Sequence, residues 1–270
     1  MIINNKYEII QLIGKGGFSK VYLAKNNITN EYVAIKMEKL QTTTPVLKIE
    51  AEIYILLQKR KINISPKFKC YGIYKKYSYI VLEFIDTTLT SIMKEKTNLS
   101  FDYVCQLGQQ MIYLLKSLHS QGILHRDIKP GNFVFSKNAK SLKLIDFGLS
   151  KVYLINNVHI PIKEGYKMLG TAKYASLNIH HGIEYSRRDD IESMIYTLIE
   201  LYKGVLPWGY CICKDKQDTY KIIEMIKDKC NMERFCGNEA IVLVEILDYI
   251  RSLNFDDEPN YEWIKNKLNI

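Results

Sequence analysis

The stretch "LHRDIKPGNF", residues 124–133, decides how this chain is interpreted, because it gathers five kinds of polar side chain in an apolar run. Phosphoryl transfer uses a carboxylate that accepts the proton of an attacking hydroxyl, a cation near the transferred group, and oxygen ligands for Mg²⁺. Asp127, Lys129 and Asn132, at the spacing D-x-K-x-x-N, are suited to these three tasks in that order. A surface loop could also collect such residues by chance, so the rest of the chain must supply the remaining parts of the site.

Two further stretches supply parts of this kind. "LKLIDFGLS", residues 142–150, ends a β-type run at Asp146, whose carboxylate would be a second oxygen ligand for Mg²⁺. "IGKGGFSKVYLAK", residues 13–25, places three glycines between two strand patterns, where the bare backbone can approach phosphate oxygens. A strand follows these glycines rather than a helix, so the pattern is not a dinucleotide-binding fingerprint. Taken alone, it is weak evidence for a phosphate site, because glycine turns between strands are common.

Lys36 lies in the apolar strand pattern "VAIK", residues 33–36, where a lysine at a sheet edge is the simplest interpretation. The next helix pattern indicates that Lys36 has a buried partner, because Glu50 falls within the apolar stripe of that helix. The stripe consists of Val46, Ile49, Ile53, Leu56 and Leu57. An unpaired buried carboxylate is costly, so we expect an ion pair between Lys36 and Glu50, with Glu52 on the solvent side.

Composition sets the limits of the interpretation. The 270 residues are 47% hydrophobic and 25% charged, as in ordinary soluble globular proteins. The six cysteines fit no zinc pattern, which favours free thiols in a reducing compartment. The net charge of +9 is spread along the chain, which fits an acidic or phosphorylated protein partner and predicts no specific nucleic-acid site. No apolar run approaches membrane length and no signal peptide is evident, so we expect a protein of the cytoplasm or nucleus that is not secreted. We also expect it to be a monomer.

The character of the chain changes after residue 85. Strand patterns occupy residues 7–13, 19–25, 31–37 and 77–84, with one helix pattern between them that Thr44 and Pro45 would begin. Helix patterns follow at residues 100–122, 186–204, 217–229, 239–253 and 260–268. The sequence therefore predicts an α+β fold of two lobes, a small β-rich lobe over residues 1–85 and a helical lobe over residues 86–270.

In this order, the glycine turn, the strand lysine, the helix glutamate, "HRDIKPGN" and "DFG" resemble the eukaryotic protein kinase superfamily across nearly all of the chain. The resemblance implies the bilobal kinase fold, with ATP and Mg²⁺ as cofactors, Asp127 and Lys129 as catalytic residues, and Asn132 and Asp146 as metal ligands. His125 and Arg126 would be structural members of the catalytic loop. The residues that it implies for ATP binding are Ile13, Gly14, Gly16, Val21, Ala34, Lys36, Glu50, Leu82, Glu83 and Ile85.

A second resemblance rests on "LGTAKYASLNIHHGIEYSRRDDIES", residues 169–193, and "RSLNFDDEPNYEWI", residues 251–264. Both are similar to the casein kinase 1 group, which implies transfer to Ser or Thr of acidic or phosphate-primed protein substrates, without activating phosphorylation. Lys173 stands where that group places an anion-binding arginine, and lysine keeps the charge but loses the bidentate fork. A second basic residue of this pocket stays open among Lys214, Lys216 and Lys221.

The same resemblance implies roles for further residues. Thr171 would lie beside the catalytic Asp127 and Lys129, and Asp190 would brace the catalytic loop. Arg187 and Arg188 are expected to anchor the start of their helix against the catalytic region.

Two rival functions remain. One is a pseudokinase that binds nucleotide and acts as a scaffold, which the presence of Lys36, Asp127 and Asp146 disfavours. The other is a small-molecule kinase of the aminoglycoside or choline type, which lacks the forms "HRDIKP" and "GTAKYASLN".

Overall fold

The computed structural model describes residues 1–17, 19–40, 46–95, 99–136 and 141–269. The predicted helix start at Thr44 and Pro45 lies outside these residues. The chain forms two compact units, Met1–Thr87 with Val134–Gly148, and Thr88–Phe133 with Leu149–Ile270. The sequence analysis placed Val134–Gly148 with the helical lobe, whereas here this segment packs in the first unit. The Leu144 N–H donates to the Ile64 carbonyl over 2.7 Å.

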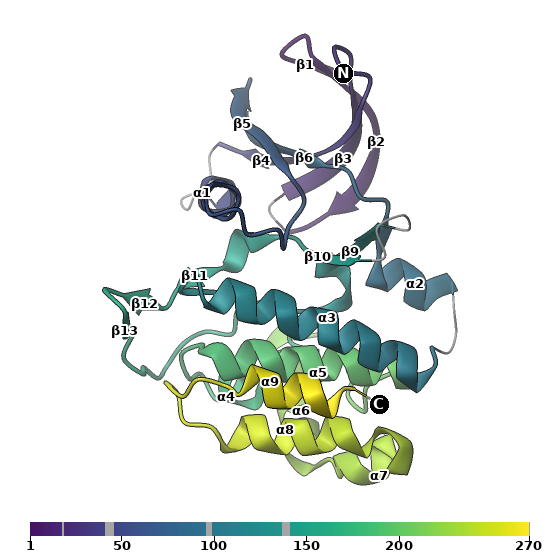
Figure 1. The fold of residues 1–270 in the computed structure, drawn as a ribbon, viewed down its shortest axis with the longest axis vertical. Helices are drawn as coiled ribbons and strands as arrows, with labels where there is room; N and C mark the ends of the chain where they lie inside the picture. Colours follow the sequence, from purple (N-terminus) through teal and green to yellow (C-terminus); the bar gives the residue numbers. More distant parts are fainter. Residues whose placement is uncertain (18, 41–45, 96–98, 137–140, 270) are drawn as a thin grey trace. The chain divides into compact units, whose positions relative to one another are not determined.

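The first unit is built on a curled antiparallel sheet (Figure 1) in the order β1-β2-β3-β4-β6-β5. Its strands are β1 (Ile2–Ile3), β2 (Tyr7–Lys15), β3 (Ser19–Asn26), β4 (Tyr32–Lys39), β5 (Phe68–Tyr74) and β6 (Tyr77–Glu83). The four predicted strands are confirmed as β2, β3, β4 and β6. The sequence analysis missed β5, whose apolar residues are interrupted by Lys69 and Gly72. The short strands β9 (Phe133–Ser136) and β10 (Ser141–Leu144) pair with each other.

Helix α1 (Val46–Lys59) buries Leu47, Glu50, Ala51, Ile53, Tyr54 and Leu57. The predicted stripe was wrong in part, because Ile49 is 39% exposed. The buried face is instead set by aromatic packing. The Tyr54 ring meets the Phe147 ring edge-on, with centroids 4.9 Å apart. Glu50 lies on this face and Glu52 is exposed, as predicted.

The second unit is helical (Figure 1). Its helices are α2 (Leu89–Glu95), α3 (Phe101–His119), α4 (Leu177–His180), α5 (Arg187–Lys203), α6 (Lys216–Lys229), α7 (Met232–Cys236), α8 (Ile241–Ser252) and α9 (Tyr261–Lys267). The five helices predicted for this part are confirmed as α3, α5, α6, α8 and α9. Helix α5 packs against both α3 and α8 and is buried along most of its length. Gly204 ends it with φ of 78°, a backbone conformation that favours glycine.

The α+β composition predicted from the sequence is confirmed. None of the six cysteines forms a disulfide. Among the described residues, no helix is both long enough and apolar enough to cross a membrane.

Candidate active site

One face of the first unit's sheet gathers the residues implied for nucleotide binding. In register, Val21 of β3 faces Lys36 of β4, and Ala34 of β4 faces Leu82 of β6. Gly14 of β2 faces Val21 in turn. Because facing residues of antiparallel strands project to the same side of the sheet, these five positions form one continuous patch.

Lys36 lies at the centre of a three-residue charge cluster in this unit. Its Nζ is 2.6 Å from Glu50 Oε2 and 2.6 Å from Asp146 Oδ1. Burial would lower the pKa of Lys36, but the two carboxylates outweigh it and raise that pKa above its ordinary value. The predicted pair between Lys36 and Glu50 is confirmed, and Asp146 is a further partner that the sequence analysis did not assign to it. The Glu50 side chain is 1% exposed, whereas that of Asp146 is 43% exposed.

The glycine turn joins β2 to β3 through a hydrogen bond from the Gly16 N–H to the Ser19 carbonyl, 2.9 Å long. A side chain added at Gly17 would meet no described atom within 4 Å. The described atoms therefore leave open space beside this backbone, which is compatible with the approach of a phosphate group expected from the glycine pattern.

The remaining residues implied for nucleotide binding lie at the end of β6 and at a strand edge. Leu82 is 8% exposed and Ile13 is 43% exposed. The Glu83 side chain accepts a hydrogen bond from the Lys67 N–H over 3.1 Å, so this carboxylate supports the turn before β5. Ile85 is half-buried beyond the strand.

Asp127 is the centre of the polar groups in the second unit. Its Oδ1 accepts a hydrogen bond from the Thr171 hydroxyl over 2.8 Å, and its Oδ2 lies 2.5 Å from Lys129 Nζ. Lys129 also donates to the Thr171 hydroxyl over 3.1 Å, which closes a triangle. Asn132 Nδ2 donates to the Asp127 carbonyl over 2.7 Å. The amide nitrogen is therefore engaged, which leaves the Asn132 oxygen as a ligand of the kind that Mg²⁺ prefers.

Asp190 supports the backbone just before this triangle. Its carboxylate accepts from the N–H groups of His125 and Arg126 over 2.7 and 2.8 Å, and from His119 Nε2 at 3.0 Å. Burial would raise the pKa of Asp190, but hydrogen bonds and the nearby histidines lower it below its ordinary value. The implied bracing contacts are therefore present as hydrogen bonds to two successive amides.

Gly170 is a site residue that the sequence analysis missed. Its φ is 80°, and an added Cβ would lie 2.6 Å from the Arg126 carbonyl oxygen. Only glycine fits at this close approach without a shift of the backbone. The contact joins residues 44 positions apart, so no local sequence pattern reveals it.

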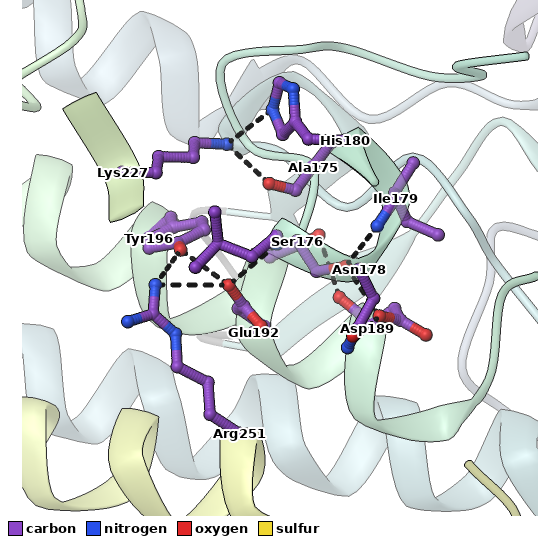
Figure 2. A network of polar contacts seen from close by, with 12 residues as sticks. Ala175, Ser176, Asn178, Ile179, His180, Asp189, Glu192, Tyr196, Lys227 and Arg251 are labelled. Carbon is purple, nitrogen blue, oxygen red and sulfur yellow. Dashed lines mark hydrogen bonds and ion pairs between the residues drawn. The ribbon is translucent and has the colours of Figure 1, made fainter. Parts of the chain in front are cut away.

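A second residue that the sequence analysis missed is Lys227 of α6, which is 1% exposed. Its ammonium contacts two carbonyl oxygens, one ring nitrogen and two aromatic rings: the Ala172 and Ala175 carbonyls, His180 Nε2, and the rings of Tyr196 and Trp208. Figure 2 shows Lys227 directed toward Ala175 and His180. It therefore fixes the backbone on both sides of Lys173, in the segment that begins at Thr171.

Carboxylates of α5 hold the following residues of the same segment (Figure 2). Asp189 Oδ1 accepts from the Ser176 hydroxyl over 2.5 Å, and Glu192 Oε1 accepts from the Leu177 N–H over 3.1 Å. Glu192 also accepts from the Tyr196 hydroxyl over 2.6 Å. Residues 172–180 are thus tied to α5 and α6 by buried polar groups.

The residues proposed to bind a substrate anion differ in their surroundings. Lys173 forms an ion pair with Glu200, whose side chain is 5% exposed and which also accepts from the Tyr174 hydroxyl. The positive charge of Lys173 is therefore already matched inside the chain. In contrast, Lys214, Lys216 and Lys221 are exposed before and along the start of α6. The three exposed lysines are the cations of this group that face solvent most fully.

Arg187 and Arg188 anchor the start of α5. Their guanidinium groups donate to the Asp256 and Leu253 carbonyls, beyond the end of α8. Arg187 also donates to the Tyr153 hydroxyl over 3.5 Å and lies 5.2 Å from the centroid of that ring, in the segment that follows the "DFG" stretch. The predicted anchoring against the catalytic region is therefore seen for Arg187, whereas Arg188 ties α5 to the end of α8.

In a comparison with models of known families, the chain matches the model described as protein kinase domain. The match covers residues 7–249. It spans the glycine turn, the Lys36 cluster, the Asp127 triangle and the segment held by Lys227.

Proposed function

Because the chain belongs to the protein kinase domain family and is a protein kinase, we propose that it is a Ser/Thr kinase of casein kinase 1 type. It would transfer the γ-phosphoryl group of ATP to Ser or Thr side chains of acidic or phosphate-bearing proteins. Protein kinase domains generally use ATP and Mg²⁺. The alternative is a pseudokinase that binds nucleotide without transferring phosphate.

The observation that carries the proposal is the triangle of Asp127, Lys129 and Thr171. An attacking hydroxyl must donate its proton to a nearby carboxylate, and Asp127 already accepts a hydrogen bond from a hydroxyl, that of Thr171. The Lys129 ammonium lies beside both groups, where it offsets the negative charge that develops on transfer. In the proposal, the hydroxyl of a substrate Ser or Thr donates its proton to Asp127.

Each unit also offers oxygen ligands that fit Mg²⁺. In the proposal, Asn132 and Asp146 would hold the metal ion, which offsets the charge of the phosphate groups when it is bound. The bond from Asn132 to the Asp127 carbonyl orients the amide, and the ion pair with Lys36 orients the Asp146 carboxylate. Lys36 would contact the α- and β-phosphates, and Glu50 would keep its ammonium in place.

The preference for acidic or phosphate-bearing substrates rests on charge. The chain carries a net charge of +9, and Lys214, Lys216 and Lys221 are exposed. Ammonium groups form charge-assisted hydrogen bonds with phosphate and carboxylate oxygens. Full activity without phosphorylation of residues 146–178 belongs to the same proposal. A mass spectrum in which activity follows phosphate on these residues would contradict it.

The test is transfer of labelled γ-phosphate from ATP with Mg²⁺ to matched Ser peptides. The three peptides carry phosphoserine, Asp or Ala three residues before the target Ser. Asp127→Asn is the inactive comparison, and Asp102→Asn, an exposed acid on α3, is the control for a lost charge. Transfer by the wild type and the control but not by Asp127→Asn supports the kinase, and a faster rate on the phosphoserine peptide supports the anion preference. ATP binding without transfer to any peptide or to casein would favour the pseudokinase.

A further inference from the structure

A cavity of about 440 Å³ opens in the first unit. Its lining includes Lys15, Lys20, Tyr22, Met37, Lys75 and Tyr77. The volume lies in the range of sites that bind small organic molecules. All of the residues that line the cavity belong to the first unit, so the unit holds this space without the second one.

The cavity lies on the opposite face of the sheet from the nucleotide patch. Side chains alternate between the two faces along a strand, so Lys20 and Met37 point away from the side that carries Val21 and Lys36. The register agrees, because Lys20 faces Met37 whereas Val21 faces Lys36. The cavity is therefore separate from the Lys36 cluster.

The rim of the cavity carries like charges. Lys15 and Lys20 face each other directly across β2 and β3, an arrangement that is destabilising when nothing offsets it. Lys75, in the turn between β5 and β6, and Lys39 of β4 also line the cavity. Among the described residues, Lys15, Lys20 and Lys75 have no carboxylate within ion-pair distance, and no acidic residue lines the cavity. The site therefore favours a ligand with more than one negative charge.

The inner wall has the opposite character. Met37 is 5% exposed and belongs to the hydrophobic core of the sheet, and Tyr22 and Tyr77 pack against that core. Lys75 Nζ lies 5.4 Å from the centroid of the Tyr74 ring, which also lines the cavity. A ligand that fits both parts has an apolar or aromatic body beside the tyrosines and an anionic head beside the lysines.

We propose that this cavity binds a small organic phosphate, an aromatic or aliphatic body that carries a phosphate dianion as its head. The two facing ammonium groups of Lys15 and Lys20 bind the head, and the tyrosine rings and Met37 contact the body. Gly16 and Gly17 also line the cavity, so an occupant contacts the glycine turn from the side away from Lys36. The proposal does not rest on the proposed phosphoryl transfer, and its test needs no kinase activity.

The experiment is calorimetric titration of the whole protein with 1-naphthyl phosphate, with a saturating ATP analogue and Mg²⁺ present to fill the nucleotide site. We expect one site per chain. Inorganic phosphate, which is the head alone, and 1-naphthol, which is the body alone, should each bind at least about tenfold more weakly, because each loses one set of contacts.

The variant Lys15→Ala/Lys20→Ala should weaken binding of 1-naphthyl phosphate at least about tenfold, because it removes both facing ammonium groups. The matched control is Lys59→Ala/Lys67→Ala, which removes two exposed lysines of the same unit that do not line the cavity, and it should bind as the wild type does. No binding at millimolar probe, equal weakening in both variants, or equal affinity for inorganic phosphate would overturn the proposal. Much tighter binding of a phosphotyrosine peptide than of 1-naphthyl phosphate would contradict the assignment to a small molecule.

Discussion

The substitution Lys227→Met tests whether a buried ammonium holds the segment that begins at Thr171. Methionine has a similar length but no donor, so the Ala172 and Ala175 carbonyls lose their partner. Each unsatisfied buried acceptor costs about 1–3 kcal/mol. Relief from the burial of a cationic group offsets part of this cost. We therefore expect the free energy of unfolding to fall by about 2 kcal/mol near neutral pH.

The effect should depend on pH with a definite sign. Burial lowers the pKa of Lys227 well below its ordinary value, with Arg251 acting in the same direction and Glu192 against it. The folded chain thus loses this proton at a lower pH than the unfolded chain. Between the folded-state pKa and about 10.4, the unfolded chain binds more protons, so the wild type gains stability relative to Lys227→Met as pH rises. The gain is at most about 1.4 kcal/mol per pH unit and is lost as pH falls through the folded-state pKa.

Chemical denaturation of both proteins at several pH values measures this difference. The matched control is Lys229→Met, which removes an exposed lysine from the same helix and should leave stability within about 0.5 kcal/mol. In peptide phosphorylation, Lys227→Met should raise KM for the peptide and leave KM for ATP unchanged, because its partners lie in the segment after Thr171. Equal stability of Lys227→Met and the wild type at both pH 6 and pH 9 would refute the reasoning.

Three further substitutions test the second unit. Asp127→Asn should retain ATP binding and lower kcat at least about 100-fold, because it removes the proton acceptor; normal transfer rates would contradict this role. Glu200→Gln should leave Lys173 without its counter-ion. In the peptide assay above, we expect kcat/KM for the phosphoserine peptide to rise about 3- to 10-fold relative to that for the Ala peptide. An unchanged ratio would show that Lys173 does not contact the substrate. Gly170→Ala should lower the midpoint of thermal unfolding by several degrees, because its Cβ would lie 2.6 Å from the Arg126 carbonyl oxygen, and a variant as stable as the wild type would contradict this.

Hydrophobic periodicity predicts that a charged residue has a buried partner when that residue falls within the apolar stripe of a helix. Glu50 was found in this way, and its ion pair with Lys36 is present. The same signal exists for Lys227, which lies four residues after Ile223 and seven after Tyr220 on α6, but the sequence analysis did not use it. A buried charge on a helix can therefore be inferred from its own helix, whereas the identity of its partner cannot.

Contacts between residues far apart in the chain could not be predicted from the sequence, because they depend on how the chain folds back on itself. Asp146 was predicted as a metal ligand, but its ion pair with Lys36 depends on how a chain segment 110 residues away folds back onto the sheet. Likewise, the sequence identifies Lys173 as a basic residue, but only tertiary structure shows that it is paired with Glu200. A motif identifies the chemical group that a side chain carries. The net charge around that group in the folded chain depends on neighbours that no local pattern encodes.

Groups of the chain itself hold residues in the segment from Thr171 to His180. Glu200 accepts from Lys173 and Tyr174, Lys227 binds the carbonyls of Ala172 and Ala175, and Asp189 accepts from Ser176. A phosphate group added to such a segment orders it when the segment supplies unpaired cations, since new charge-assisted bonds then form. Lys173 is not such a cation, because Glu200 already supplies its negative charge. Phosphorylation here would therefore compete with an existing ion pair rather than create a new one, which favours a kinase whose substrate-side segment is ordered before any modification.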